Sequence, residues 1–443
     1  MIPTNEKPVS SFRISQFIRQ ETLGGILLIL ATLAAVFWAN SSFYDTYHYL
    51  THEIRVGTTF GDFNFSLHHW VNDGLMALFF FTIGLEIKRE VMGGELSSVK
   101  KAALPVMAAI GGMVVPAAVF WVFNGNNPDH SLGWGIPMAT DIAFALGIVA
   151  LLGSRVNINL KIFLTALAIA DDLGAILVIA VFYTDTINYY QLGIALVAII
   201  ILIFGNRMGI RSSLFYGFIG LVGVWLAFFF SGVHATIAGV LIAFIIPGNA
   251  KINEIDYIDS LCKLLTKFEN EKPNDSKLLT HEQAHLIGKI EALGNDAQTP
   301  LQRLEHILHP ISAYMIIPVF ALFNAGVRIE GNIMDMVLHP VSLGIIAGLV
   351  LGKLIGISIF SHLVIKLKLA VLPEGVCFRD IYGAALLAGI GFTMSIFIAD
   401  LAFSDPQVIQ IAKVGIFTAS ILSAIFGVLV LLSGKKTGTS AEE

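Results

Sequence analysis

Apolar segments long enough to cross a bilayer recur along nearly the whole of this 443-residue chain. A membrane-spanning helix needs about 20 mainly apolar residues. The stretch 212–250 has no Asp, Glu, Lys or Arg over 39 residues, which is too long for one crossing and suffices for two joined at Ser231-Gly232. The pattern therefore predicts an all-α integral membrane fold with twelve transmembrane helices. They begin near Thr22, Phe65, Ala103, Leu132, Val156, Gln191, Ser213, Gly232, Ile311, Val341, Asp380 and Ile409.

Two of the predicted spans contain residues that interrupt an α-helix. In GWGIPMATDIAFALG (133–147), Pro137 removes a backbone hydrogen bond. In LLAGIGFTMSIF (386–397), Gly389 and Gly391 flank a position that a helix tolerates poorly. The two interrupted spans are the fourth and the eleventh. The fourth is the middle one of spans three to five, and the eleventh is the middle one of spans ten to twelve. Broken helices at matching positions indicate inverted repeats in a transporter whose binding site lies near the middle of the membrane.

Two polar segments separate the apolar stretches. Residues 53–69 (EIRVGTTFGDFNFSLHH) alternate apolar and polar positions around a Gly-Asp pair, which predicts a small β-hairpin. This hairpin is either a structured loop or an edge that pairs with a second subunit. In residues 248–310, helical spacing of apolar residues predicts short amphipathic helices. The apolar positions are Ile258, Leu261, Leu265, Phe268, Leu301, Leu304 and Leu308.

The distribution of basic residues sets the orientation in the membrane. If both termini are cytoplasmic, 23 of the 27 Lys and Arg residues lie on the cytoplasmic side, as the positive-inside rule requires. The chain then divides into a cytoplasmic tail (1–21), eight spans (22–247) with the hairpin outside, a cytoplasmic loop (248–310), four spans (311–432) and a second cytoplasmic tail (433–443). Cys262 and Cys377 both fall on the cytoplasmic side, so we expect no structural disulfide.

Composition agrees with a membrane protein and carries little information about partners. Apolar residues make up 56% of the chain and charged residues 13%, whereas soluble domains are about 25% charged. The net charge of −5 does not indicate an acidic or basic partner, because the basic residues are sorted to one face. We expect no nucleic-acid partner and no cofactor.

Charged side chains deep in the spans are the strongest chemical signal. A carboxylate at a helix centre costs about 2.5 to 3.5 kcal/mol on insertion, so such residues usually have a function. The deepest ionisable residues are Asp141, Asp171, Asp172 and Lys353. Neighbours on a helix point about 100° apart, so one of Asp171 and Asp172 is expected to be a cation ligand and the other its flank. Buried carboxylates can hold a proton or a hard cation, which is the chemistry of a cation/proton antiporter.

The residues alone leave several roles open. Lys353 can pair with Asp171 or neutralise the negative ends of the broken helices, and Asp141 can serve their positive ends. Asp73, near the start of the second span, is either a helix cap or part of the outer access path. The charged run at the inner end of that span is a solvated rim or a regulatory network. It comprises Glu86, Lys88, Arg89 and Glu90.

A competing enzymatic motif lies in the cytoplasmic loop. HEQAH (281–285) matches the H-E-x-x-H pattern of zinc hydrolases, and Gly288 and Glu291 extend it with spacing similar to the metzincin form. Glu291 stands where that form has a third His, and the segment offers no domain that could form a cleft. A solvated helix is therefore the preferred interpretation, and the chain is not expected to be an enzyme. A membrane-attached zinc hydrolase and a cation channel are the alternative functions.

Seven segments together resemble the NhaA-type sodium/proton antiporters over essentially the whole chain. They are WVNDGLMALFFFTIGLEIKRE, PMATDIAFALG, LTALAIADDLGAI, SGVHATIAG, LEHILHP, GLVLGKLIGIS and GIGFTMSIFIA. The resemblance implies exchange of sodium or lithium ions for protons by alternating access in a bacterial inner membrane, with regulation by pH. It implies that Asp171, Asp172 and Thr140 form the cation and proton site, and that Asp141 and Lys353 compensate charge where two broken helices cross.

The resemblance also implies regulatory and assembly features. A cytoplasmic pH-responsive cluster would contain Glu86, Arg89, Glu305, His306 and His309, with His234 as a further pH-linked position. The outer hairpin matches the element through which the family's dimers pair, so a homodimer is expected. The chain departs from the family pattern at residues 251–302, where the loop that contains HEQAH is longer than usual.

Overall fold

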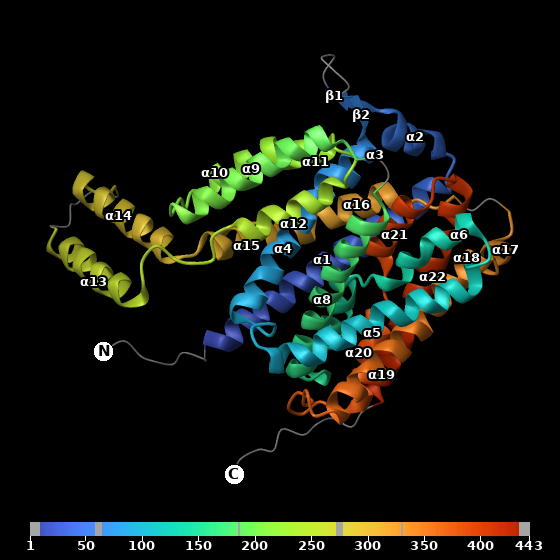
Figure 1. Cartoon of the computed structure of the whole chain (residues 1–443). Helices are drawn as coiled ribbons and strands as arrows, with labels where there is room; N and C mark the ends of the chain where they lie inside the picture. Colours follow the sequence, from blue (N-terminus) through green and yellow to red (C-terminus); the bar gives the residue numbers. More distant parts are fainter. Residues whose placement is uncertain (1–8, 58–63, 185–186, 272–277, 329–330, 434–443) are drawn as a thin grey trace, which may run out of the picture.

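The computed structural model describes residues 9–57, 64–184, 187–271, 278–328 and 331–433, and it is mainly helical (Figure 1). Among these residues, seven helices are each long and apolar enough to cross a membrane, and two bent helix pairs would raise the number to nine. The seven are Leu67–Gly93, Val99–Asn124, Ile158–Phe182, Tyr189–Arg207, Pro300–Asn324, Pro340–Lys366 and Pro406–Leu432.

Three shorter apolar helices lie where the first, seventh and eighth spans are predicted. They are Leu23–Ala39, which is the apolar part of α1 (Val9–Ala39), Ser213–Phe229 and Ala235–Ile245. The described residues therefore give seven to nine span candidates, and the count of twelve stays a prediction.

Both predicted helix breaks are present. The first separates η3 (Leu132–Met138) from α7 (Ile142–Leu151), and the second separates α20 (Phe378–Ala388) from α21 (Phe392–Ala402). The helix pairs bend by 41° and 46° at these points. The first break follows Pro137, which has no N–H to donate, and Ala139 is extended. The amide of Asp141 in the first break donates to the carbonyl of Ile390 in the second at 2.7 Å, so the two breaks touch.

The ninth predicted span is part of a longer helix than the hydrophobic pattern suggests. The helix begins at Pro300 rather than near Ile311, and α15 (Pro300–Ile311) continues into α16 (Ile317–Asn324). Its start is fixed by Thr299, whose hydroxyl accepts a hydrogen bond from the amide of Gln302 at 3.1 Å. Pro300 occupies the first helical position, where the missing N–H has no effect.

Several helices, among them α7 and α20, pack on α8 (Ile158–Phe182), which occupies the middle of the bundle (Figure 1). The helix α5 (Val99–Asn124) lies against α8 and packs along α19 (Lys353–Lys366). Gly111 on α5 meets Gly356 on α19 so closely that a Cβ at either position would overlap the backbone of the other helix. This close approach brings Lys353, the first residue of α19, toward the centre of the bundle.

A second layer has its own apolar core, which includes Leu202, Tyr216 and Val224. It is built from α9 (Tyr189–Arg207), the helix Ser213–Phe229 (α10, η5 and α11) and α12 (Ala235–Ile245). Of these elements, α12 packs directly on α4 (Met76–Gly93) of the bundle.

The predicted hairpin is confirmed as a small antiparallel sheet of β1 (Arg55–Gly57) and β2 (Asn64–Ser66). Its register pairs Arg55 with Ser66 and Val56 with Phe65. The Gly-Asp pair of the expected turn, at positions 61 and 62, lies outside the described residues.

The predicted amphipathic helices of the polar loop are also present. Ile258, Leu261, Leu265 and Phe268 lie on α13 (Glu254–Asn270), and Leu301, Leu304 and Leu308 lie on α15. A further helix, α14 (His281–Ala297), carries HEQAH and packs on α13, and both helices project away from the bundle (Figure 1). Cys262 and Cys377 are both free thiols.

Candidate functional site

An ion pair between α8 and α19 lies at the centre of the site. Lys353 Nζ is 2.6 Å from Asp171 Oδ2, and the two side chains are only 1% and 2% exposed. The same Nζ donates a hydrogen bond to Thr140 Oγ1 at 2.9 Å. The expected pairing of Lys353 with Asp171 is therefore present, and Lys353 also binds the first helix break.

Thr140 connects this ion pair to the second helix break. Its hydroxyl donates to the carbonyl of Ala388, the last residue of α20, at 2.8 Å. The C-terminal end of a helix carries partial negative charge on its unpaired carbonyls. Lys353 thus pairs with Asp171 and is connected through Thr140 to the C-terminal end of α20, so the geometry is compatible with both roles that the sequence leaves open.

Asp141 joins the N-terminal ends of both broken helices. It is the N-cap of α7, and its Oδ1 accepts from the amide of Phe144 at 3.0 Å. Its Oδ2 accepts from Thr393, the second residue of α21, through the amide at 3.0 Å and the hydroxyl at 2.5 Å. A carboxylate is stabilised there because helix N-termini carry partial positive charge. The structure thus places Asp141 where a carboxylate can compensate the charge of both helix N-termini, and this role stays a prediction.

Asp172 is the carboxylate of the site without an ion pair, although Oδ1 of Asp171 also lacks a hydrogen-bond partner among the described residues. The side chain of Asp172 is 2% exposed, and its Oδ1 is likewise buried without such a partner within the described ranges. Unlike Asp171, it forms no ion pair with Lys353. A buried carboxylate oxygen without a donor can accept a proton or ligate a hard cation, because both ligands supply the missing positive charge.

A second charged network connects α4 to α15. Arg89 Nε is 3.3 Å from Glu305 Oε1, and its guanidinium also lies 2.9 Å from Glu90 and 3.9 Å from Glu86. The three acidic side chains are only 11% to 16% exposed, so they do not form a solvated rim. His306 and His309 follow Glu305 on α15. The structure thus brings together Glu86, Arg89 and Glu305 of the expected cluster.

Lys88 has a separate task in this region. Its ammonium group donates to the carbonyls of Phe244 and Ile246 at the C-terminal end of α12, and the first of these bonds is 2.6 Å long. A lysine in this position satisfies carbonyls that have no partner inside the helix. The residue therefore stabilises the end of α12.

His234 lies apart from the network of Glu305. It is the N-cap residue of α12, at the opposite end of that helix from the carbonyls bound by Lys88. Its Nε2 is 2.6 Å from the carbonyl oxygen of Tyr183. The histidine lines a cavity of about 370 Å³.

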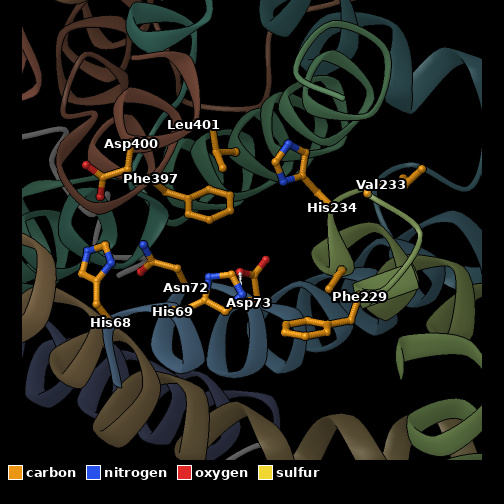
Figure 2. A pocket seen from close by; sticks show the side chains of 12 residues that line it. His68, His69, Asn72, Asp73, Phe229, Val233, His234, Phe397, Asp400 and Leu401 are labelled. Atoms are coloured by element: carbon orange, nitrogen blue, oxygen red, sulfur yellow. Dashed lines mark ion pairs between the residues drawn. The ribbon is translucent and has the colours of Figure 1, made fainter. Parts of the chain in front are cut away.

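Asp73 lies in that same cavity (Figure 2). Its Oδ2 is 3.4 Å from His69 Nε2, and Figure 2 shows the two side chains beside one another. The interpretation of Asp73 as a helix cap is wrong, because Ser66 is the residue that caps this helix, by accepting from the amide of His69 at 3.2 Å. Asp73 lies inside the continuous helix Leu67–Gly93, and its side chain is 23% exposed.

One buried ion pair was missed by the analysis of the sequence. Asp400 on α21 pairs with Lys413 on α22 (Pro406–Leu432), with Lys413 Nζ 3.2 Å from Asp400 Oδ1. The signal was an acidic residue in the apolar run IFIADLAF and a lysine in the following span. Burial in a span would have identified both residues as candidates, but the hydrophobic pattern does not indicate that they meet.

The HEQAH motif does not form a metal centre with other residues. His281 and His285 lie one turn apart on the projecting helix α14. Across the described ranges, no group of three or more His, Cys, Asp or Glu side chains is arranged to hold a metal ion. A catalytic zinc site needs three protein ligands, so the zinc hydrolase alternative has no support here.

Comparison with known proteins gives consistent matches over nearly the whole chain. A family model described as Na+/H+ antiporter 1 matches residues 15–431. The chain is 49% identical to the Na(+)/H(+) antiporter NhaA 1 of Psychromonas ingrahamii, over 93% of this chain and 94% of the relative. It is 48% identical to the Na(+)/H(+) antiporter NhaA of Oleidesulfovibrio alaskensis (97% and 96%) and 46% identical to that of Helicobacter pylori (96% of each).

Proposed function

Because this chain belongs to the Na+/H+ antiporter 1 family, we propose that it exchanges sodium ions for protons across a membrane. It is a transporter rather than an enzyme, and its apolar helices make it a multi-pass membrane protein. The observation that carries the proposal is the buried carboxylate of Asp172 beside the ion pair of Asp171 and Lys353, where two broken helices touch. Such a site near the middle of a broken-helix bundle is typical of secondary transporters.

We assign the exchange itself to Asp172. A sodium ion binds oxygen ligands, and Asp172 supplies a buried oxygen that no donor in the described part of the chain occupies. Asp171 supports the site, but a cation must compete with Lys353 for it. Thr140 offers a hydroxyl oxygen next to Lys353. Protons compete with sodium for the same carboxylates, so binding of one ion displaces the other.

The touching helix breaks support a mechanism of alternating access. In this proposal, the chain has twelve spans with inverted repeats, and the broken-helix bundle rocks to expose the site to each side in turn. Lithium follows the same route as sodium.

Phe397 lies on α21 one turn beyond Thr393, and its side chain is buried. The centre of its ring is 5.7 Å from that of Phe80 and 6.1 Å from that of Phe320. Phe397 also lines the cavity that contains Asp73, and we place Asp73 on the outer access path.

The remaining assignments concern topology, regulation and assembly. We place the protein in the bacterial inner membrane with both termini and the loop 248–310 in the cytoplasm, following the positive-inside rule. We propose that the network of Glu86, Arg89 and Glu305, with His306 and His309, responds to cytoplasmic pH, since histidine titrates near neutrality. His234 would respond on the outer side. The hairpin of β1 and β2 would pair two copies in a homodimer, because a sheet edge offers unpaired backbone groups.

Everted membrane vesicles that maintain a pH gradient test the function. Addition of sodium is expected to dissipate the gradient with the wild-type chain and to have no effect with Asp172→Asn, which keeps the shape of the side chain and removes its charge. Asp405→Asn is the matched control, because Asp405 caps α22 by accepting from the amide of Gln407 at 2.9 Å, and Asn caps a helix equally well. Persistent sodium exchange by Asp172→Asn would overturn the assignment of the site.

Two further measurements separate Asp171 from Asp172 and the antiporter from a channel. Asp171→Asn is expected to weaken or alter the coupling of sodium to protons without abolishing sodium movement, because Asp172 remains. An antiporter drives sodium uphill at the expense of an imposed proton gradient, whereas a channel only lets sodium run downhill. Failure of the wild-type chain to accumulate sodium against its gradient would support the channel.

A further inference from the structure

The ion pair of Asp400 and Lys413 has no role in the exchange site described above. It joins α21 to α22 at 3.2 Å, and the two side chains are only 9% and 11% exposed. Withdrawal of two charges from water costs several kcal/mol per ion, and a buried ion pair often stabilises a fold no better than apolar residues of the same size. Stability alone therefore does not account for this pair.

One carboxylate oxygen of Asp400 is not engaged by Lys413, and the residue lines a cavity. Lys413 contacts Oδ1, while Oδ2 is buried without a hydrogen-bond partner in the part of the chain that the structure describes. Asp400 lines the cavity of about 370 Å³ together with Asp73 (Figure 2). Other titratable groups around Asp400 and this cavity are Tyr47, His52, His68, His69 and His234.

The cavity repeats the chemistry of the exchange site. There, Lys353 neutralises Asp171, and the neighbouring Asp172 has a buried oxygen without a donor. Here, Lys413 neutralises Asp400, and Asp400 itself has the free oxygen. Each site thus combines a lysine as internal counter-charge with a carboxylate oxygen that can ligate a hard cation.

The position of Asp400 places it on the route between the exchange site and the outside. Thr393, which binds Asp141, Phe397 and Asp400 follow one another on α21 at intervals of about one turn. Phe397 lines the same cavity as Asp400 and is itself buried. An ion that passes Phe397 from the exchange site therefore enters the cavity beside Asp400.

We propose that this cavity is an outer binding site for the transported alkali cation, with Asp400 as its ligand and Lys413 as the counter-charge of the cation-free state. The inference rests on the proposed sodium/proton exchange and adds a second binding site to it. A leaving sodium ion would bind the carboxylate of Asp400 after passing Phe397, and Lys413 would hold Asp400 when the ion departs.

The test compares the apparent KM for sodium from the two sides of the membrane, in right-side-out and everted vesicles with the full-length chain. Asp400→Asn is expected to raise the KM from the outer side roughly tenfold, the effect of losing one charged ligand. The KM from the cytoplasmic side is expected to stay unchanged. Asp405→Asn, which lies on the loop between α21 and α22 and not in the cavity, is the matched control and should alter neither value.

Two additional variants separate a ligand from a structural ion pair. Asp400→Asn/Lys413→Gln leaves no unpaired buried charge and should give the same rise in the outer KM. Exchange of the two charges (Asp400→Lys/Lys413→Asp) would restore the wild-type KM if the pair only held α21 to α22. We expect the KM to stay raised, because the exchange moves the carboxylate to α22.

Three results would overturn this site. The first is an unchanged outer KM in both Asp400→Asn and Asp400→Asn/Lys413→Gln. The second is an equal rise of the KM on the two sides of the membrane. The third is a wild-type outer KM in Asp400→Lys/Lys413→Asp. A wild-type chain without any sodium-dependent proton movement would instead overturn the proposed exchange, and this site with it. The two failures are therefore distinguishable.

Discussion

Lys353 and Asp171 lie 2.6 Å apart in an ion pair that is almost completely buried, although 182 residues separate them in the chain. The pair occupies Oδ2 of Asp171, whereas Asp172 forms no ion pair, and both acids keep a buried Oδ1 without a hydrogen-bond partner among the described residues. Two adjacent acids on one helix therefore have different surroundings. The difference gives each of them a separate predicted role in ion exchange.

The buried ion pair predicts a strong effect of removing one partner. In Lys353→Met, the carboxylate of Asp171 would stay buried without its counter-charge, which is expected to lower the free energy of unfolding by about 3 to 5 kcal/mol. Asp171→Asn/Lys353→Met, which carries neither charge, should recover most of the loss. Thermal unfolding of the purified proteins in detergent measures both changes. Equal destabilisation of the single and double variants would contradict the argument.

The contact of α5 with α19 predicts that Gly356→Ala destabilises the protein. A methyl group at this position would overlap the carbonyl oxygen of Gly111, and overpacking of this kind costs about 1 to 3 kcal/mol. Displacement of α19 should also lower the rate of exchange, because that helix carries Lys353. Thermal unfolding and the vesicle assay measure the two effects.

Gly193→Ala is the control for the glycine at the helix contact. Gly193 lies in α9, and an added Cβ would meet nothing within 4 Å. Alanine is favoured over glycine in a helix by up to about 1 kcal/mol, so this variant should be neutral or slightly more stable. Comparable losses in the two variants would show that the close approach of the helices is not the cause.

His52 predicts a loss of stability in acid. It lies in η1 (Tyr49–Glu53), and its ring stacks between the rings of His48 and His68. The distances between ring centres are 5.0 Å to His48 and 4.8 Å to His68. Burial, followed by the charges of His68, His48 and Lys413, lowers the pKa of His52 from 6.5 to about 4, while Asp400 acts in the opposite direction. Between these two values the unfolded chain binds a proton at His52 that the folded chain does not. The free energy of unfolding therefore falls as the pH drops from 6.5 to 4.

The pH dependence of thermal unfolding checks this prediction. His52→Gln cannot be protonated, so its stability should fall less steeply than that of the wild type between pH 6.5 and 4. Above pH 6.5 the two curves should run parallel, because His52 is neutral in both states. Identical slopes for the wild type and His52→Gln would refute the assignment.

The HEQAH segment predicts that transport does not depend on zinc. Its two histidines have no third protein ligand among the described residues, so a chelator and the variant Glu282→Gln should leave sodium-dependent proton movement unchanged. Metal analysis of the purified protein measures the zinc content directly. Stoichiometric zinc, together with loss of transport in Glu282→Gln, would contradict this prediction.

Local properties of the sequence determined most of the helices and the identity of the unusual residues. Hydrophobic stretches locate the long helices because each stretch is apolar over its own length. Pro137 interrupts its helix because proline lacks an N–H, and Gly389 and Gly391 mark the second break for a similarly local reason. The acids at 171 and 172 stand out because a charge in an apolar span is expensive wherever its partner lies.

Only the tertiary structure decided which of these residues meet. Asp141 accepts a hydrogen bond from Thr393, which lies 252 positions away in the sequence. Asp400 forms its ion pair with Lys413 on the next helix. His234 lies in the cavity of Asp73, away from the network of Glu305. Such partners depend on how each helix is rotated about its axis and on how closely glycine contacts let two helices approach. These quantities come from packing between distant segments, which the periodicity of one segment does not contain.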